Sequence, residues 1–522
     1  MNPPIEHDPH EDTLFGHPKG LFVLFAAEMW ERFCYYGMRA LLTLYLTKAL
    51  LMGDAVASGI YGAYTALVYA APVLGGRIAD RLLGYRKAII FGGILMAIGE
   101  FVLLGATEMT LYAGMGLIIV GNGYFKANIS TVVGRLYRDG DERRDSGFTI
   151  FYLGINLGAL LATTVCAWVG ETYGYHYGFG LAGVGMLIGI GAFIFGLPLL
   201  QGHGLPPDET YLHEKVFGVS RQNLTYLASI AAAPLLYFVL QQHHFVEYLH
   251  TLDIPAINAV IAFMDPLDYA LWGIWLLVNG KLIQNALREN DGGVLLHRTY
   301  ALIILQVFNI VFWACFEQAG TSLTLFADRN VDRAIGSWVM PASMTQSANS
   351  FFIVAFAGFF SALWLKLDRL NINPNIPMKF GLGIIQAGLG YLLLIVGGAL
   401  VGPDALVPLW IVVFMYMLHT TGELFLSPIG LSMVTKLAPK TMTGTVMGAW
   451  FLSFSLSNKV AGKLAGLTGS GEGGVETADM TPIDSLTTYL DVFGTMGYVL
   501  VAFGVFVALL SRPINRLMHG VR

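Results

Sequence analysis

Long apolar segments separated by short polar ones recur along the whole chain. A helix needs about 20 mostly apolar residues to cross a lipid bilayer. We therefore predict fourteen membrane-spanning helices, at residues 20–50, 57–82, 87–107, 110–137, 146–169, 176–200, 222–243, 254–284, 299–327, 342–367, 377–401, 406–437, 443–466 and 485–511. The pattern predicts an all-α membrane protein that crosses the bilayer many times.

The spacing of these segments divides the chain into two halves. An Asp-Arg pair follows the second helix of each half, at Asp80-Arg81 and Asp368-Arg369, which fits two bundles of six helices. A polar break from residue 201 precedes two additional helices. The predicted parts are a polar N-terminus at 1–19, a six-helix bundle at 20–200, a linker with two inserted helices at 201–298, a second six-helix bundle at 299–511 and a tail at 512–522.

Composition supports a membrane protein and excludes several other classes. Of the 522 residues, 55% are hydrophobic and only 12% are charged, whereas soluble domains are roughly 25% charged. The 62 glycines suit helices that pack closely in lipid. The three cysteines, Cys34, Cys166 and Cys315, lie in apolar segments and provide no disulfide framework.

Basic residues concentrate in every second connection between the predicted helices. The connections after the second and fourth helices carry Arg81, Arg86, Lys87, Arg135, Arg138, Arg143 and Arg144, and the alternate ones carry Asp54, Glu108 and Glu171. Basic connections stay in the cytoplasm, and the number of spans is even, so both termini are predicted to be cytoplasmic. Residues 1–19 lack the basic start of a secretory signal, so the first helix is expected to be a true span.

The first predicted helix contains a cluster of ionisable residues in the stretch "EMWERFCYYGMR", residues 28–39. At 100° per residue, Glu28, Glu31, Arg32, Tyr36 and Arg39 fall within an arc of about 140°. One polar face of the helix therefore points to a cavity or a partner helix. The alternative is an ion-pair cluster that only locks helices together, but ionisable groups inside a membrane are functional by default.

Other helices also carry polar residues at membrane depth: Lys126, Tyr152, Asn156, Trp313, Glu317, Gln318, Asn349, Glu423 and Ser427. An unpaired charge there costs a few kcal/mol or more, so Lys126 and Glu423 each require a partner, water or a ligand. For Asn349, a bond between helices is as good an explanation as a ligand contact. Tyr36, Tyr69, Trp313 and Trp450 are candidates for cavity walls, with ordinary packing as the alternative.

The two halves differ in charge. The first half offers Arg32, Arg39 and Lys126, partly countered by Glu28 and Glu31, and the second offers Glu317 and Glu423. A cavity between the halves would have a cationic wall opposite an anionic wall. Such a cavity suits a small zwitterion whose charges lie at opposite ends.

The chain resembles the proton-dependent oligopeptide transporters of the major facilitator superfamily. The pattern E-x-x-E-R-F-x-Y-Y-G runs from Glu28 to Gly37, and "GGRIADRLLGYRK", "GYFKANIS", "FYLGINLG" and "GELFLSPIGLS" extend the resemblance over nearly the whole chain. Bacterial members have a helix pair inserted between the halves. The resemblance implies a proton-coupled symporter of the bacterial inner membrane that imports di- and tripeptides by alternating access.

The resemblance also implies roles for individual residues. Proton coupling would involve Glu28, Glu31, Arg32, Lys126, Glu317 and Glu423. Arg39, Lys126, Tyr36 and Arg32 would bind the peptide carboxylate, and Glu423, Asn156 and Asn349 would bind the amino terminus. Tyr69, Tyr152, Trp313, Trp450 and Ser427 would line the pocket, and Arg39 with Glu317 would form a gate. Protons are the coupling ion; no cofactor, metal or nucleic acid is implied.

Two departures from the family pattern bear on proton coupling. Some members carry a second carboxylate where Phe316 stands here, and others use a histidine in the second helix, which residues 57–80 lack. Coupling therefore falls on Glu28, Glu31 and either Glu317 or Glu423. The alternatives are a transporter of nitrate or another small organic anion, which Glu423 disfavours, and a peptide receptor that does not transport. The absence of hydrolase, metalloprotease and P-loop motifs argues against an enzyme.

Overall fold

The computed structural model describes residues 13–138, 141–261, 264–289, 292–438, 442–469 and 479–521; at 427–429, 431, 432, 435 and 443 it describes the backbone alone. In these residues, ten helices are long and apolar enough to cross a membrane, or eleven if one bent pair counts as a span. Three more long helices, α1, α4 and α18, are more polar. Together they account for the fourteen predicted segments.

The chain begins with the hairpin β1 (Thr13–Leu14) and β2 (His17–Pro18). The first bundle then comprises α1 (Lys19–Leu44), α2 (Asp54–Ile78), α3 (Tyr85–Val102), α4 (Glu108–Arg135), α5 (Arg143–Leu161), α6 (Ala167–Tyr173) and α7 (Tyr175–Gly196). The insertion follows with α8 (Glu209–His213), the antiparallel pair β3 (Lys215–Val216) and β4 (Val219–Ser220), α9 (Arg221–Leu240), α10 (Gln242–Thr251), α11 (Pro255–Ile261) and α12 (Pro266–Arg288).

The second bundle comprises α13 (Val294–Phe316), α14 (Ser322–Asn330), α15 (Ser347–Arg369), α16 (Ile376–Gly398), α17 (Leu409–Leu437), α18 (Thr443–Gly466), α19 (Pro482–Leu509) and α20 (Ser511–Leu517). Its connections contain the antiparallel pair β6 (Ala334–Ile335) and β7 (Trp338–Val339). They also contain the parallel pair β5 (Val331–Asp332) and β8 (Val407–Pro408).

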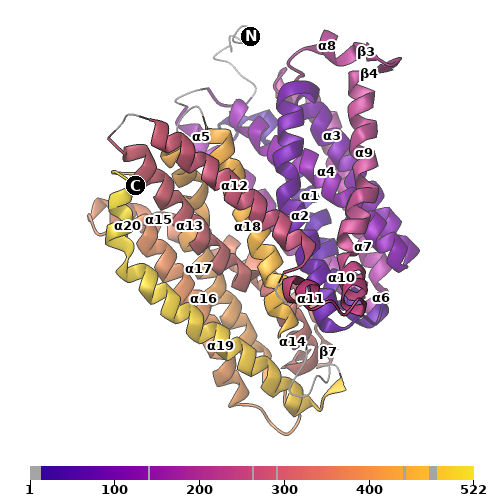
Figure 1. Cartoon of the computed structure of the whole chain (residues 1–522), viewed down its shortest axis with the longest axis vertical. Coiled ribbons are helices and arrows are strands. Elements are labelled where there is room, and N and C mark those ends of the chain that lie inside the picture. The colour runs from indigo at the N-terminus through magenta and orange to yellow at the C-terminus, as the bar shows by residue number, and fades with distance from the viewer. Residues whose placement is uncertain are drawn as a thin grey trace.

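The two halves of the chain form two bundles side by side (Figure 1). One hydrophobic cluster is built almost wholly from residues 21–275, and another from residues 282–518. Across the interface α2 packs against α18 and α5 against α15. We name two ends of the molecule: the basic end carries the connections α2–α3 and α4–α5 with Arg81 and Arg135, and the opposite end carries the connection α1–α2.

Glycines bring the helices of the first bundle into backbone contact. A Cβ atom on Gly75 of α2 would lie 2.1 Å from the carbonyl oxygen of Gly123 in α4, and one on Gly92 of α3 would lie 2.4 Å from that of Gly121. Close approach of this kind drives helix association in lipid, where burial of apolar surface gives little. The same device joins the bundles, because a Cβ on Gly62 of α2 would lie 2.9 Å from the Cα of Gly462 in α18.

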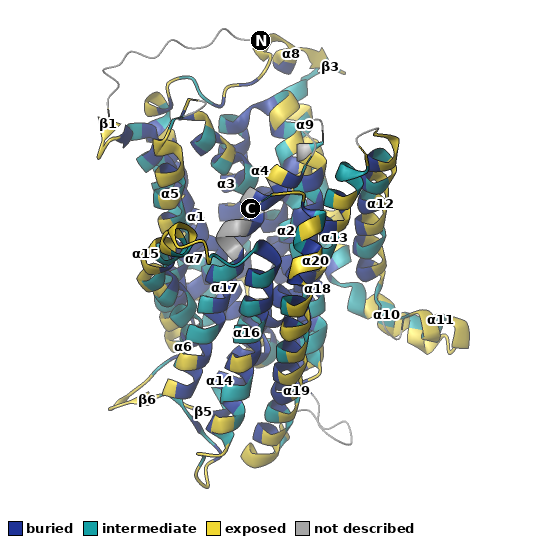
Figure 2. Ribbon diagram, turned by 90° about the vertical axis from the view of Figure 1, so that its left-hand side faces the viewer, coloured by how far each residue is buried: buried dark blue, intermediate teal, exposed yellow. Residues whose placement is uncertain are grey.

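The inserted helices contact both bundles. Helix α9 packs on α4 of the first bundle, and α12 packs on α13 and α18 of the second. On that second contact, Asp265 and Asp268 form ion pairs with Lys459 and Lys463 of α18. Figure 2 shows α10 and α11 projecting from the side of the molecule, and neither helix contains a buried residue.

The structure divides the predicted span at 254–284 into two helices, α11 and α12. The axes of α11 and α12 differ by 63°, and the longer helix α12 begins at Pro266. The local reason is a helix-start signal of two residues, which an average of hydropathy over a long window does not detect. Pro266 occupies the first turn, where its missing N–H is not needed, and the Asp265 side chain accepts a hydrogen bond from the backbone N–H of Asp268.

We expect Gly75→Leu to destabilise the protein strongly, because its side chain would occupy the space of the Gly123 carbonyl. Overpacking of this kind costs about 1–3 kcal/mol or more. A Cβ atom on Gly59 in the same helix would meet no atom within 4 Å, so Gly59→Ala is the matched control and should leave stability equal or slightly higher. Thermal unfolding in detergent measures both variants, and equal melting temperatures would contradict the packing.

Candidate functional site

A cavity of about 1120 Å³ lies between the two bundles. Its lining includes Arg135, Arg144 and His203, so it extends to the basic end. Most predicted site residues also line it, namely Glu28, Arg32, Tyr36, Arg39, Tyr69, Lys126, Tyr152, Asn156, Trp313, Glu317, Asn349 and Glu423. The cavity is lined by residues of eight helices, α1, α2, α4, α5, α13, α15, α17 and α18, which are up to 426 positions apart in the chain (28 to 454).

Arg32 is shared by two carboxylates on its own helix. Its Nε atom lies 2.9 Å from Glu28 Oε1 and 2.5 Å from Glu31 Oε2. Asn122 of α4 donates a hydrogen bond of 2.9 Å to Glu31 Oε1. Glu31 is fully buried behind Arg32 and does not line the cavity. A ligand that attracts Arg32 would therefore change the charge balance at Glu28 and Glu31 together.

Lys126 faces the same side of the cavity and is not neutralised by an ion pair. Its Nζ atom lies 3.7 Å from the centroid of the Tyr69 ring, a cation–π contact. Among the described residues no carboxylate oxygen lies within 4.0 Å of it. The position leaves an ammonium group available to an anionic ligand.

Glu423 of α17 lies on the other wall. Asn349 of α15 donates hydrogen bonds of 3.0 Å to Glu423 Oε2 and to Thr420 Oγ1. The carboxylate is 6% exposed, and in the part of the chain that the structure describes no cationic nitrogen lies within 4.0 Å of it. Asn156 of α5 also lines the cavity, and its amide donates a hydrogen bond of 3.0 Å to the Tyr152 carbonyl. This wall suits a ligand ammonium group.

Polar contacts close the space between the bundles toward the opposite end. Arg39 of α1 forms an ion pair with Glu317 and donates a hydrogen bond to the Tyr61 hydroxyl. One turn further along α1, Thr43 donates to the Gly320 carbonyl at 2.5 Å.

Further ties between the bundles follow at the same end. Asp54 pairs with Arg329 at 2.5 and 2.8 Å, and Lys48 pairs with Asp328 at 2.6 Å. Glu171 accepts hydrogen bonds from the backbone N–H groups of Ala342 and Ser343 at 2.9 and 2.8 Å. The structure is therefore closed at the opposite end and open at the basic end.

Aromatic rings form part of the cavity walls, but one of the predicted aromatic residues is not among them. Trp450 does not line the cavity; it is 2% exposed and packs in the core of the second bundle. Phe454, one turn later in α18, lines the cavity instead and stacks on Tyr69 with 5.7 Å between ring centroids. Trp313 lies 5.4 Å from the same Phe454 ring. The side chain of Ser427 lies outside the described residues.

Sequence reasoning missed the residues that hold these groups in place. Asn122, Tyr61, Thr420 and Phe454 all contact a predicted site residue. One signal was present for Asn122, because it precedes Lys126 by four positions and so shares its helix face. No comparable signal marked Tyr61, since its partner Arg39 lies on another helix.

The chain resembles known membrane transporters over nearly its full length. The family model described as PTR2, POT family, matches residues 86–478. The chain is 36% identical to the uncharacterized transporter YclF of Bacillus subtilis, with 97% of this chain and 96% of YclF covered. It is 34% identical to the peptide transporter YePEPT of Yersinia enterocolitica (98% and 97% covered) and 33% identical to the di-/tripeptide transporter of Lactococcus lactis (98% and 99% covered).

A solved structure supports the same comparison. The crystal structure of the peptide transporter POT in complex with sulfate is 32% identical, covers 98% of both chains and superposes with a TM-score of 0.77. The two-bundle arrangement with inserted helices is therefore shared over nearly the whole chain.

Glu317→Gln is expected to lower the melting temperature, because it leaves the buried Arg39 guanidinium without its counter-ion. Breaking a buried pair from one side costs about 3–5 kcal/mol. Adding Arg39→Gln to Glu317→Gln should recover part of the loss. The control is Lys48→Gln, since Lys48 is 47% exposed in its pair with Asp328 and such a pair contributes about 0–1 kcal/mol. Equal effects of Glu317→Gln and Lys48→Gln on thermal unfolding in detergent would contradict this assignment.

Proposed function

The chain belongs to the POT family, and we propose that it carries di- and tripeptides across the membrane together with protons. One observation carries the proposal: the cavity has an ammonium without a carboxylate partner on one wall, at Lys126, and a carboxylate without a cationic partner on the other, at Glu423, among the residues that the structure describes. A peptide of two or three residues is a zwitterion with its charges at opposite ends. The relatives named as peptide and di-/tripeptide transporters support the same substrate class.

The peptide carboxylate would bind to Lys126 and Arg32, with Arg39 and Tyr36 beside them. Its amino terminus would bind to Glu423, with Asn349 and Asn156 as further contacts. The aromatic and polar walls would come from Tyr69, Tyr152, Trp313 and Phe454, with Ser427 as a further candidate. Side chains of the peptide would occupy the remaining space, which a cavity of about 1120 Å³ provides.

Proton coupling would follow because the peptide carboxylate and the carboxylates of the protein compete for the same cationic side chains. Arg32 lies between Glu28 and Glu31 and favours the ionised form of both carboxylates. A peptide carboxylate that draws Arg32 or Lys126 weakens this compensation and favours protonation of a carboxylate. Protonation of Glu317 would likewise remove the charge that holds Arg39 across the gate. Proton and peptide would thus favour the same conformations, and each would strengthen binding of the other.

Transport would proceed by alternating access of the cavity to the two sides of the membrane, through rocking of one bundle against the other. The basic connections support a cytoplasmic location, at a bacterial inner membrane, for the basic end, both termini and the opening of this cavity. The driving force is the proton gradient, with about 2.3 kcal/mol per charge for each 100 mV of membrane potential. No cofactor takes part.

The decisive experiment is uptake of a labelled dipeptide into proteoliposomes under an imposed proton gradient. We expect Glu31→Gln to abolish accumulation driven by the gradient and to retain exchange of peptide across the membrane, because exchange needs no net proton movement. Glu100→Gln is the matched control: Glu100 is a fully buried carboxyl group of the first bundle that does not line the cavity and should be replaceable.

The outcome also decides between the candidate functions. Uptake that is independent of the gradient would remove proton coupling, and binding without uptake would indicate a receptor. Competition of dipeptide uptake by nitrate would indicate an anion transporter, which Glu423 in the cavity wall disfavours by repulsion.

Glu423→Gln should weaken binding of a free dipeptide by about 10- to 100-fold, the value of a hydrogen bond to a charged group. It should hardly change binding of the same dipeptide with an acetylated amino terminus, since that ligand has no ammonium group. Lys126→Gln should likewise weaken binding of a dipeptide with a free carboxyl terminus and should hardly change binding of the same dipeptide with an amidated carboxyl terminus.

The control for these binding measurements is Lys379→Gln, because Lys379 is a buried lysine of the second bundle that contacts the Trp364 ring and does not line the cavity. Isothermal titration with each ligand measures the four proteins. Equal losses for free and blocked peptides would contradict the assignment of the two ends.

A further inference from the structure

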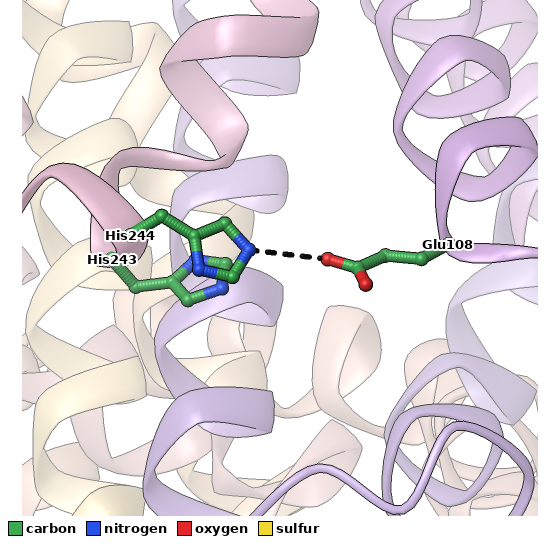
Figure 3. Close-up of side chains that lie close together, drawn as sticks. All are labelled: Glu108, His243 and His244. Atoms are coloured by element: carbon green, nitrogen blue, oxygen red, sulfur yellow. Dashed lines mark hydrogen bonds and ion pairs between the residues drawn. The ribbon is translucent and has the colours of Figure 1, made fainter. Parts of the chain in front are cut away.

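Two histidines and a glutamate meet on the flank of the first bundle, outside the lining of the central cavity. Glu108 is the first residue of α4, and His243 and His244 lie in the first turn of α10, directly after α9 (Figure 3). One ligand atom from each of the three side chains lies within 4.8 Å of the others. None of the three lines the cavity.

The donor atoms match the preferences of one class of ion. Imidazole nitrogen and carboxylate oxygen are ligands that Zn²⁺ takes at about 2.0–2.2 Å, usually four in a tetrahedron. His244 Nε2 lies 3.3 Å from Glu108 Oε1, which is about the separation of two ligand atoms on one zinc ion. Three protein ligands leave the fourth position to water. Glu247 is also close, with Oε2 at 3.6 Å from His244 Nδ1.

The surroundings hold two of the three side chains in position. Glu108 stands at the start of α4, which Thr107 and Thr110 cap by reciprocal hydrogen bonds. The His243 ring lies against Tyr112, with 6.4 Å between centroids, and against the His244 ring at 4.0 Å. Its Nδ1 atom is buried and has no hydrogen-bond partner among the described residues. A buried polar atom without a partner leaves binding capacity unused.

The site is also open to an ion from solution, because the side chains of His244 and Glu108 are 55% and 42% exposed. We propose that Glu108, His243 and His244 bind a divalent transition-metal ion of the zinc class. The ion would fasten the connection between the inserted helices to the start of α4. The competing explanation is a plain ion pair between a protonated His244 and Glu108, which needs no metal and makes no use of His243.

The test uses the full chain, purified in detergent with a removable tag that contains no histidine, and Zn²⁺ alone as the probe. Isothermal titration should give one Zn²⁺ per chain. His243→Ala, His244→Ala and Glu108→Gln should each weaken binding by about 100-fold or more, since even loss of a residue that only supports a ligand costs about 10- to 100-fold. The matched control is His250→Ala, an exposed histidine of the same helix α10, which should bind zinc as the unmodified chain does.

Size-exclusion chromatography and dipeptide binding establish that each variant is folded. If one is not, X-ray absorption at the zinc edge on the unmodified chain still decides, with a shell of nitrogen and oxygen atoms at about 2.0–2.1 Å and imidazole scattering expected. The proposal is overturned by a lack of binding at Zn²⁺ up to about 1 mM. It is equally overturned by full binding in His243→Ala, or by an absorption spectrum without imidazole ligands.

Discussion

Moving a charge from water into a membrane protein costs several kcal/mol unless another group compensates it. This cost organises the interior of the molecule. Arg32 lies between Glu28 and Glu31, and Asn122 satisfies a remaining carboxylate oxygen. Among the predicted site residues that the structure describes, Lys126 and Glu423 have no ion-pair partner within 4.0 Å, and both line the cavity. The other charged side chains of the network are paired, and these two are not. A zwitterionic ligand would supply an opposite charge to each of them.

The same constraint links binding to conformation. The ion pair of Arg39 and Glu317 spans the two bundles, and both groups also line the cavity. A ligand that competes for Arg39 therefore acts on the contact that closes the opposite end. The outer ties, such as Asp54 with Arg329, involve residues outside the cavity lining. They stabilise the closed end without sensing the ligand directly.

Much of the fold could be predicted from the sequence, because a segment that crosses the lipid must be mostly apolar and hydropathy measures this property directly. Fourteen long helices were predictable, and the break before Pro266 was not, since averaging over a window hides a two-residue start signal. In the site, one-helix geometry placed Glu28, Arg32 and Arg39 correctly on the cavity side. It could not separate Trp450 from Phe454, which lie one turn apart, because helix rotation depends on packing between bundles.

Contacts between residues on different helices also could not be predicted from the geometry of one helix. Nothing in the local sequence connects Asn122 with Glu31 or Tyr61 with Arg39, although each contact determines how a charge is compensated. Recognition of a family pattern supplied the residue types, and three-dimensional packing supplied their contacts.

The crossing of α2 and α18 at Gly62 and Gly462 has a mechanical consequence. The two backbones approach closely there, so this point would act as a fulcrum if one bundle rotated against the other. From Gly62 to the end of α2 at Ile78 the helix extends about 24 Å, at about 1.5 Å per residue. A turn of about 10° about the fulcrum would move the far tip by about 4 Å over that lever arm. A small rotation at two glycines would thus produce a displacement at the tip of α2 that is comparable to the size of a peptide side chain.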